Sequence, residues 1–262
     1  MIGRFLIRIV SWALLAYLVL PLVVILGASL STTPFLAFPP EGITLDWYRK
    51  MMADPSYVSS FATSTLLAGA ATILAVIMTV PAALALARFS FPGKAAVSSI
   101  LMSPLVLPHI VLGAALLQFG AYFGLTRNFL ALLVGHTVIV APFVLRSAFA
   151  LLTPEQRALE EASSDLGARP WTTFFLVVLP QIRPGIVTGS IFAFISSFIN
   201  VELSIFNTTA DLNTIPVKLF NYVQYTIDPT IAAVSGATII AAVLAIVILD
   251  LTIGLDMLSD RE

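Results

Sequence analysis

The sequence predicts an all-α polytopic membrane protein with six transmembrane helices. Of its 262 residues, 59% are hydrophobic and only 10% are charged, and the mean hydropathy is +1.01. A soluble domain carries about 25% charged residues, so this composition excludes a soluble enzyme and a disordered chain. Six stretches each supply the roughly 20 apolar residues that cross a hydrocarbon core. They lack the polar–apolar alternation of membrane β-strands, so helices are expected.

The six predicted spans differ in length and in proline content. The first apolar run is longer than the core of a signal peptide, which favours an uncleaved span. The second is long enough to tilt strongly in the bilayer. Pro104 and Pro108, one turn apart beside His109, are the strongest candidates for a helix kink. The predicted spans are residues 5–30, 57–87, 96–119, 129–149, 186–206 and 230–251.

Lysine and arginine in the loops predict the orientation, because cytoplasmic loops are enriched in both. With both termini in the cytoplasm, the inner side holds most of these residues. They are Arg4, Arg8, Arg88, Lys94, Arg146, Arg157, Arg169, Arg183 and Arg261. The outer side then holds only Arg49, Lys50, Arg127 and Lys218. The outer segments are residues 31–56, 120–128 and 207–229, and the inner connections are residues 88–95 and 151–185.

The remaining composition excludes several kinds of chemistry. The formal net charge is −1, so no basic excess exists to bind nucleic acid. The chain has no cysteine and only two histidines, which argues against a metal site or a thiol nucleophile. Gly93-Lys94 is followed by Ala95 rather than by the Ser or Thr of a phosphate-binding loop. We therefore expect a non-catalytic chain that binds no cofactor.

The inner segment 151–185 carries the densest charge in the chain. Thr153, Pro154 and Glu155 form a helix start, with an N-cap, a proline at the first position and an acidic first turn. We expect a helix over residues 154–166, ended by Gly167 as a left-handed C-cap. A second short helix is expected over residues 170–179, ended by prolines at 180 and 184 before the next span.

This segment resembles the EAA loop of ABC-importer permeases, the binding-protein-dependent transport family. The family pattern is Glu-Ala-Ala, three residues, Gly, nine residues, Ile, one residue and Leu-Pro. Here its positions are filled by Glu161-Ala162-Ser163, Gly167, Val177 and Leu179-Pro180, with Ser163 and Val177 as the departures. Pro39–Tyr48, Ser103–Pro108 and the segment 207–225 extend the likeness over most of the chain. The chain resembles most the second, PotC-like permease of spermidine/putrescine-type importers.

The resemblance implies a type I ABC importer fold over residues 1–262, in the bacterial inner membrane. It also implies the partners: a second, homologous permease, two ATPase subunits that hold ATP and Mg²⁺, and a periplasmic binding protein that delivers a small solute. The loop over residues 151–185 would dock on the ATPase. The residues implied in this coupling are Glu160, Glu161, Ala162, Ser163, Asp165, Gly167, Leu179 and Pro180.

Polar groups inside spans are costly, so each is a candidate for the solute pathway. Glu202 and Asn200 in the fifth predicted span, with His109 and Gln118 in the third, are these candidates. Polyamine permeases carry acidic residues at the positions of Ile199 and Asn200, which this chain lacks. The solute stays open among a polyamine, an opine, an amino-acid derivative and an aminophosphonate. The alternative reading is a secondary transporter or channel that works without an ATPase.

Overall fold

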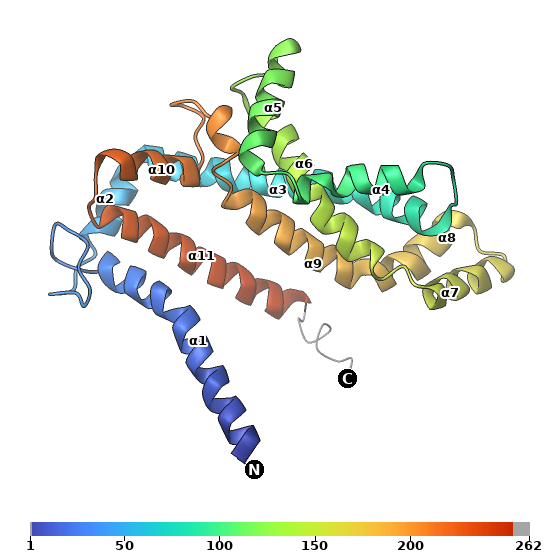
Figure 1. The fold of residues 1–262 in the computed structure, drawn as a ribbon, viewed down its shortest axis with the longest axis horizontal. Coiled ribbons are helices and arrows are strands. Elements are labelled where there is room, and N and C mark those ends of the chain that lie inside the picture. The colour runs from blue at the N-terminus through green and yellow to red at the C-terminus, as the bar shows by residue number, and fades with distance from the viewer. Residues whose placement is uncertain (1, 254–262) are drawn as a thin grey trace. The chain divides into compact units, whose positions relative to one another are not determined.

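The computed structural model describes the backbone of residues 2–253 and the side chains of residue 4 and residues 6–244. Within this part the regular structure is entirely helical (Figure 1). The helices in chain order are α1 (Ile2–Ser29), α2 (Asp46–Ala53), α3 (Pro55–Arg88), α4 (Lys94–Met102), η1 (Ser103–Leu105), α5 (His109–Tyr122), α6 (Phe129–Phe149), α7 (Pro154–Asp165), α8 (Pro170–Thr173), η2 (Phe174–Val178), α9 (Leu179–Phe198), η3 (Ser204–Phe206), α10 (Ile215–Tyr225) and α11 (Thr230–Ile253).

Four of these helical stretches are long and apolar enough to cross a membrane. They are Leu6–Ser29, Pro55–Arg88, Phe129–Phe149 and Pro170–Phe198. The pair Lys94–Leu105 and His109–Tyr122 can form a fifth span if the two helices are taken together. Helix α11 is apolar over Thr230–Leu244, the part whose side chains are described. The count of six spans and the cytoplasmic placement of both termini stay predictions.

The third predicted span is wrong as a single helix. The helices on either side of residues 106–108 are bent by 107°. Pro104 lies in the 3-10 turn η1, and Pro108 is extended with ψ 125°. Each proline lacks a backbone donor, and Pro108 also disfavours helical backbone at Leu107 before it. The kink expected from Pro104 and Pro108 is therefore confirmed, and it is a full change of direction.

The fifth predicted span, residues 186–206, has both boundaries wrong. Its helix begins at Pro170 and ends at Phe198. Neither Pro180 nor Pro184 ends it, because a π-helical turn over Phe174–Val178 absorbs the disruption just before Pro180. Gln181 Nε2 donates to the carbonyl of Val177 at 2.8 Å, which satisfies a backbone acceptor in this turn. The second helix of this loop and the following span are therefore one continuous helix.

The chain divides into two compact units, residues 1–58 with 219–262 and residues 59–218. In the first unit α1 packs against α11, where Gly236 leaves room for Tyr48 and Leu26. Lys50 Nζ lies 2.8 Å from Asp228 Oδ2 and ties α2 to the start of α11. That a single permease domain covers residues 1–262 stays a prediction.

The second unit is built on the pair α6 and α9, which lie along one another (Figure 1). Gly185 and Gly189, four residues apart on α9, face the backbone of α6. A side-chain carbon at Gly189 would lie 2.7 Å from Val144 Cα and 3.0 Å from the carbonyl oxygen of Phe143. Such small-xxx-small spacing lets two membrane helices approach closely. The core around this contact is Ala71, Ala75, Val80, Ile139, Val140, Val144, Val178, Ile182, Ala193 and Leu203.

Candidate functional site

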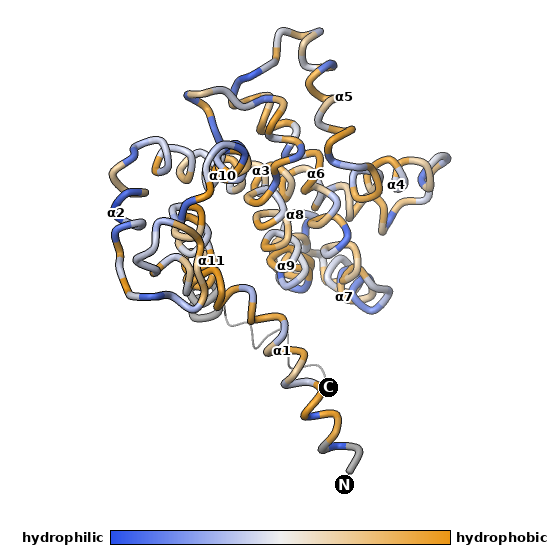
Figure 2. Tube along the Cα trace, turned by 60° about the vertical axis from the view of Figure 1, so that its left-hand side comes forward, coloured by the Kyte–Doolittle hydropathy of each residue, from blue (hydrophilic) through white to orange (hydrophobic). Residues whose placement is uncertain are grey.

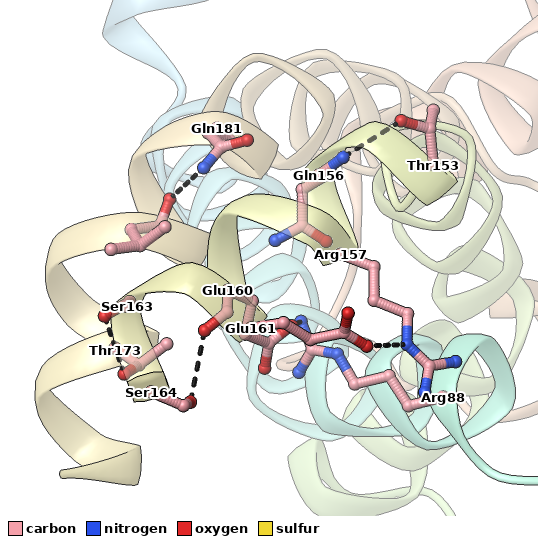
Figure 3. Close-up of polar contacts among 11 residues, drawn as sticks. Arg88, Thr153, Gln156, Arg157, Glu160, Glu161, Ser163, Ser164, Thr173 and Gln181 are labelled. Carbon is pink, nitrogen blue, oxygen red and sulfur yellow. Dashed lines mark hydrogen bonds and ion pairs between the residues drawn. The ribbon is translucent and has the colours of Figure 1, made fainter. Parts of the chain in front are cut away.

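The inner loop forms a helix, a tight turn and a second helix, as the sequence predicts. Thr153 caps α7 by accepting a hydrogen bond from the backbone N–H of Gln156 at 3.4 Å (Figure 3). At the other end Gly167 has φ +84°. Its N–H donates to the carbonyl of Ser164 at 2.9 Å, and the N–H of Ala168 donates to the carbonyl of Ser163 at 3.2 Å. These two bonds make a Schellman motif, which requires left-handed backbone at Gly167.

A direct bond holds the two helices of the loop together. Ser163 Oγ lies 3.1 Å from Thr173 Oγ1, which is buried on α8 (Figure 3). Gln156 is also buried, whereas most of the outer face of α7 is polar and exposed (Figure 2). Helix α7, the turn at Gly167 and helix α8 therefore form one rigid unit, the knob. Its second helix is the start of the long helix that leads into α9.

The predicted coupling residues lie mostly on the exposed face of this knob. Ala162, Asp165, Gly167 and Pro180 are exposed, and Ser163 and Leu179 are half-buried. The side chain of Glu161 is 64% exposed and pairs with Arg157 on the same helix, with 3.0 Å between Oε1 and Nε. Glu161 is therefore accessible to a cation on a partner.

Glu160 differs from the other acidic residues of the loop. Its Oε2 lies 2.6 Å from Nη2 of Arg88, the last residue of α3 (Figure 3). Only 22% of the Glu160 side chain and 21% of the Arg88 side chain are exposed. Its partner is thus within the chain, and no pattern in the sequence predicts Arg88 as that partner, because 72 residues separate the two positions.

Two exposed apolar side chains on this knob are not predicted from the sequence. Leu166 is 90% exposed and Trp171 is 74% exposed, on either side of the Gly167 turn. Both lie next to charged or polar residues, outside the apolar stretches. Large exposed apolar groups in a polar setting mark contact surfaces. The signal that could have found them is their position in the most charged loop of the chain.

A second candidate site lies where two helix breaks meet. His109 begins α5 after the bend at Pro108, and Asn200 follows the end of α9. Asn200 Nδ2 lies 3.2 Å from His109 Nδ1, and Glu202 Oε2 lies 3.9 Å from the same nitrogen. The Glu202 side chain is 60% exposed and lies in the turn after α9, outside the helix in which the sequence placed it.

The fourth predicted pathway residue, Gln118, does not join this group. It lies nine positions after His109 on α5, which is about two and a half helical turns and roughly 13 Å along the axis. A half-integral number of turns puts Gln118 on the face of α5 opposite to His109. The structure therefore brings together three of the four predicted residues.

Side-chain hydrogen bonds cause the break after α9. Asn200 Oδ1 accepts from the N–H of Leu203 at 2.9 Å, and Ser204 Oγ donates to the carbonyl of Asn200 at 2.7 Å. Such local bonds compete with continued helix. They turn the chain so that Asn200 is held against α5 and Glu202 points outward.

His136 on α6 supports this break from within the core. It is fully buried, with Nδ1 at 2.7 Å from Ser197 Oγ and Nε2 at 2.9 Å from Ser204 Oγ. Because the single hydroxyl proton of Ser204 goes to Asn200, Ser204 must accept from His136 Nε2–H. Its Nδ1 lies against Ser197 Oγ, so both ring nitrogens have serine partners and neither is free for a solute. Among the side chains that the structure describes, no three His, Cys, Asp or Glu residues are grouped to hold a metal ion.

Comparison with known proteins identifies the family. The model of the binding-protein-dependent transport system inner membrane component matches residues 79–260. The chain is 27% identical over 247 residues to the spermidine/putrescine transport system permease protein PotC of Escherichia coli K12, covering 94% of this chain and 93% of PotC. It is 29% identical over 213 residues to the putrescine permease PotI of the same strain, covering 79% of this chain and 75% of PotI.

Relatives whose names point to other solutes are also similar to this chain. The molybdenum transport system permease protein ModB of Mycobacterium bovis is 30% identical over 234 residues, covering 82% of this chain and 88% of ModB. The crystal structure of a bacterial ABC transporter that imports the acidic polysaccharide alginate aligns with a TM-score of 0.70 at 18% identity. It covers 96% of this chain and 95% of that one. The knob, the helix-pair core and these matches together show that the chain belongs to the binding-protein-dependent transport system inner membrane components, the permeases of ABC importers.

Proposed function

We propose that this chain is one of two permease subunits of an ATP-driven importer, and that the knob formed by α7 and α8 is its ATPase contact. The observation that carries this proposal is the exposed pair Leu166 and Trp171 flanking the rigid Gly167 turn. Two apolar anchors beside the exposed acidic Glu161 suit a groove with an apolar floor and a basic rim. ATP and Mg²⁺ are held by the ATPase, and this chain contributes no cofactor site.

In this mechanism the knob transmits the movement of the ATPase to the membrane spans. ATP binding closes the two ATPase subunits, and the docked α7 follows them. Because the second helix of the knob runs without interruption into α9, its displacement reaches the break at Asn200. The pathway then alternates between outward and inward access. A periplasmic binding protein delivers the solute on the outer side, where α2 and α10 lie in the predicted outer segments.

The solute that we propose is small and carries an amine. Glu202 is an exposed carboxylate in a chain with few charges, and it lies beside the polar atoms of His109 and Asn200. Discontinuous helices supply solute contacts in many transporters, because their ends expose polar groups at membrane depth. The similarity to PotC and PotI supports an amine, whereas ModB shows that the family as a whole accepts other solutes.

The experiment that tests this function is uptake by the reconstituted importer. Proteoliposomes containing this chain, its permease partner and the ATPase should accumulate solute only with ATP and the loaded binding protein. Uptake driven by an ion gradient without the ATPase would instead support the alternative of a secondary transporter.

In the same proteoliposomes, Glu202→Gln should raise the KM for an amine solute by about tenfold, because one charge-assisted hydrogen bond contributes roughly 1.5–3 kcal/mol. Basal ATP hydrolysis should not change. Asp211→Asn is the matched control, because Asp211 is an exposed carboxylate in the same outer part of the chain. An unchanged KM for Glu202→Gln would remove Glu202 from the pathway.

A further inference from the structure

Helix α7 carries two ion pairs of different kinds. The pair Arg157–Glu161 lies within one helical turn and is more than half exposed at both ends. The pair Arg88–Glu160 joins two separate elements and is nearly four-fifths buried at both ends (Figure 3). Screening by water weakens the first pair, whereas the second lies in a medium of lower dielectric constant. Of the two, only the Arg88–Glu160 pair joins α7 to α3, so only this pair can resist a force that separates these helices.

The end of α3 that carries Arg88 is suited to this contact. Arg88 lies in the last turn of the helix, where a cation also interacts favourably with the helix dipole. The helix dipole alone requires only an exposed arginine. It does not explain why the Glu160 side chain is nearly four-fifths buried against Arg88. The burial of both partners requires that α7 and α3 be held together.

Helix α3 connects this contact to the outer segments. Its 34 residues extend for about 50 Å. Near its other end, Ser64 Oγ accepts a hydrogen bond from the N–H of Ile215, the first residue of α10, at 2.9 Å, and both residues are buried. One continuous helix, with Pro81 inside it, is therefore bonded to the knob at Arg88 and to the start of α10 at Ser64.

We infer that the Arg88–Glu160 ion pair is a second transmission contact, which carries displacement of the ATPase-docked knob into α3. It works in parallel with the continuous α8–α9 helix. This inference rests on the proposed function, because it requires the knob to dock on an ATPase. Arg88 and Glu160 are positioning residues that touch neither solute nor nucleotide. Without the pair, α7 follows the ATPase while α3 stays behind, so ATP is hydrolysed with less transport.

The test measures solute transported per ATP hydrolysed in the reconstituted importer. Arg88→Gln and Glu160→Gln should each lower this ratio about fivefold, within the range of coupling between sites, while the ATPase still co-purifies. The double variant Arg88→Gln/Glu160→Gln leaves no unpaired charge, so its thermal stability should return to that of the parent while the ratio stays low. The charge swap Arg88→Glu/Glu160→Arg should restore the ratio to within about twofold, because it re-forms the pair.

Arg157→Gln is the matched control, since it breaks the exposed pair on the same helix and should leave the ratio unchanged. A normal ratio in the double-glutamine variant would overturn the inference, and so would a charge swap that is stable but still uncoupled. Both results would leave the proposed function intact. That function fails separately if the parent complex shows no ATP-dependent uptake.

Discussion

Gly167→Val should reduce ATP-driven uptake by at least about tenfold, since a distortion of 1–2 kcal/mol or more enters the coupling step directly. Gly167 has φ +84°, a conformation that valine adopts only with strain. The substitution removes the two hydrogen bonds of the Schellman motif, so the angle between α7 and α8 changes. No other atom lies within 4 Å of the added side-chain carbon, so the spans should still insert and fold.

The chain offers a matched control for this variant. Gly93 also has a positive φ, +82°, with nothing within 4 Å, and it lies in the other predicted inner loop. Gly93→Val introduces the same local strain at a site that we do not place on the ATPase, and uptake should stay within about twofold, because surface strain of this kind is local. Equal losses in the two variants would mean that strain alone, and not the geometry of the knob, lowers uptake.

Gly189→Leu should destabilise the chain by at least about 3 kcal/mol, at the upper end of the cost of overpacking, because the clash is with backbone. A side-chain carbon at Gly189 would be 2.7 Å from Val144 Cα, so α6 and α9 must separate. The knob is continuous with α9, so loss of this packing also removes the support of the coupling site. The measurement is the midpoint of thermal unfolding in detergent, followed by tryptophan fluorescence.

Gly69→Leu is the control for packing. Gly69 is a helical glycine of α3 with no atom within 4 Å of an added side-chain carbon. Its leucine variant adds the same apolar bulk without a clash, and the unfolding midpoint should stay within a few degrees of the parent. A Gly189→Leu variant as stable as Gly69→Leu would contradict the close packing of α6 on α9.

Much of this fold could be predicted because its signals are local. Apolar length predicts Phe129–Phe149 and Pro55–Arg88 closely, since a membrane span is defined by its own composition. The start of α7 at Thr153-Pro154 and its end at Gly167 were also predicted, because caps depend on the residues at the helix ends. Pro104 and Pro108 similarly predict a kink from their own stereochemistry.

The errors arise where a local signal competes with tertiary structure. Pro180 predicts a helix end, but a π-helical turn before it and packing on α6 keep the helix continuous. Asn200 ends α9 through local bonds with Leu203 and Ser204, and Ser204 is in turn held by the distant His136 on α6. Arg88 and Glu160 are brought together only by the packing of α3 and α7, so a single sequence does not show their pairing.

The grouping of the residues proposed for the solute pathway is predicted only in part for the same reason. The rarity of charge inside apolar stretches indicates Glu202, Asn200 and His109 as unusual residues. Helical periodicity alone separates Gln118 from His109, because nine positions put the two residues on opposite faces of one helix. His136 looks equally unusual in the sequence, and only its two serine partners show that it stabilises the core.

Cysteine cross-linking shows whether the knob around Gly167 contacts the ATPase. The chain contains no cysteine, so single replacements need no altered background. Leu166 is 90% exposed on the knob, and Ile43, in a predicted outer segment, is 82% exposed and serves as the control. In the assembled importer, a thiol–amine cross-linker should join Leu166→Cys to the ATPase and leave Ile43→Cys unjoined. If the ATPase co-purifies but is not cross-linked at Leu166, or is cross-linked equally from Ile43, the knob is not the ATPase contact.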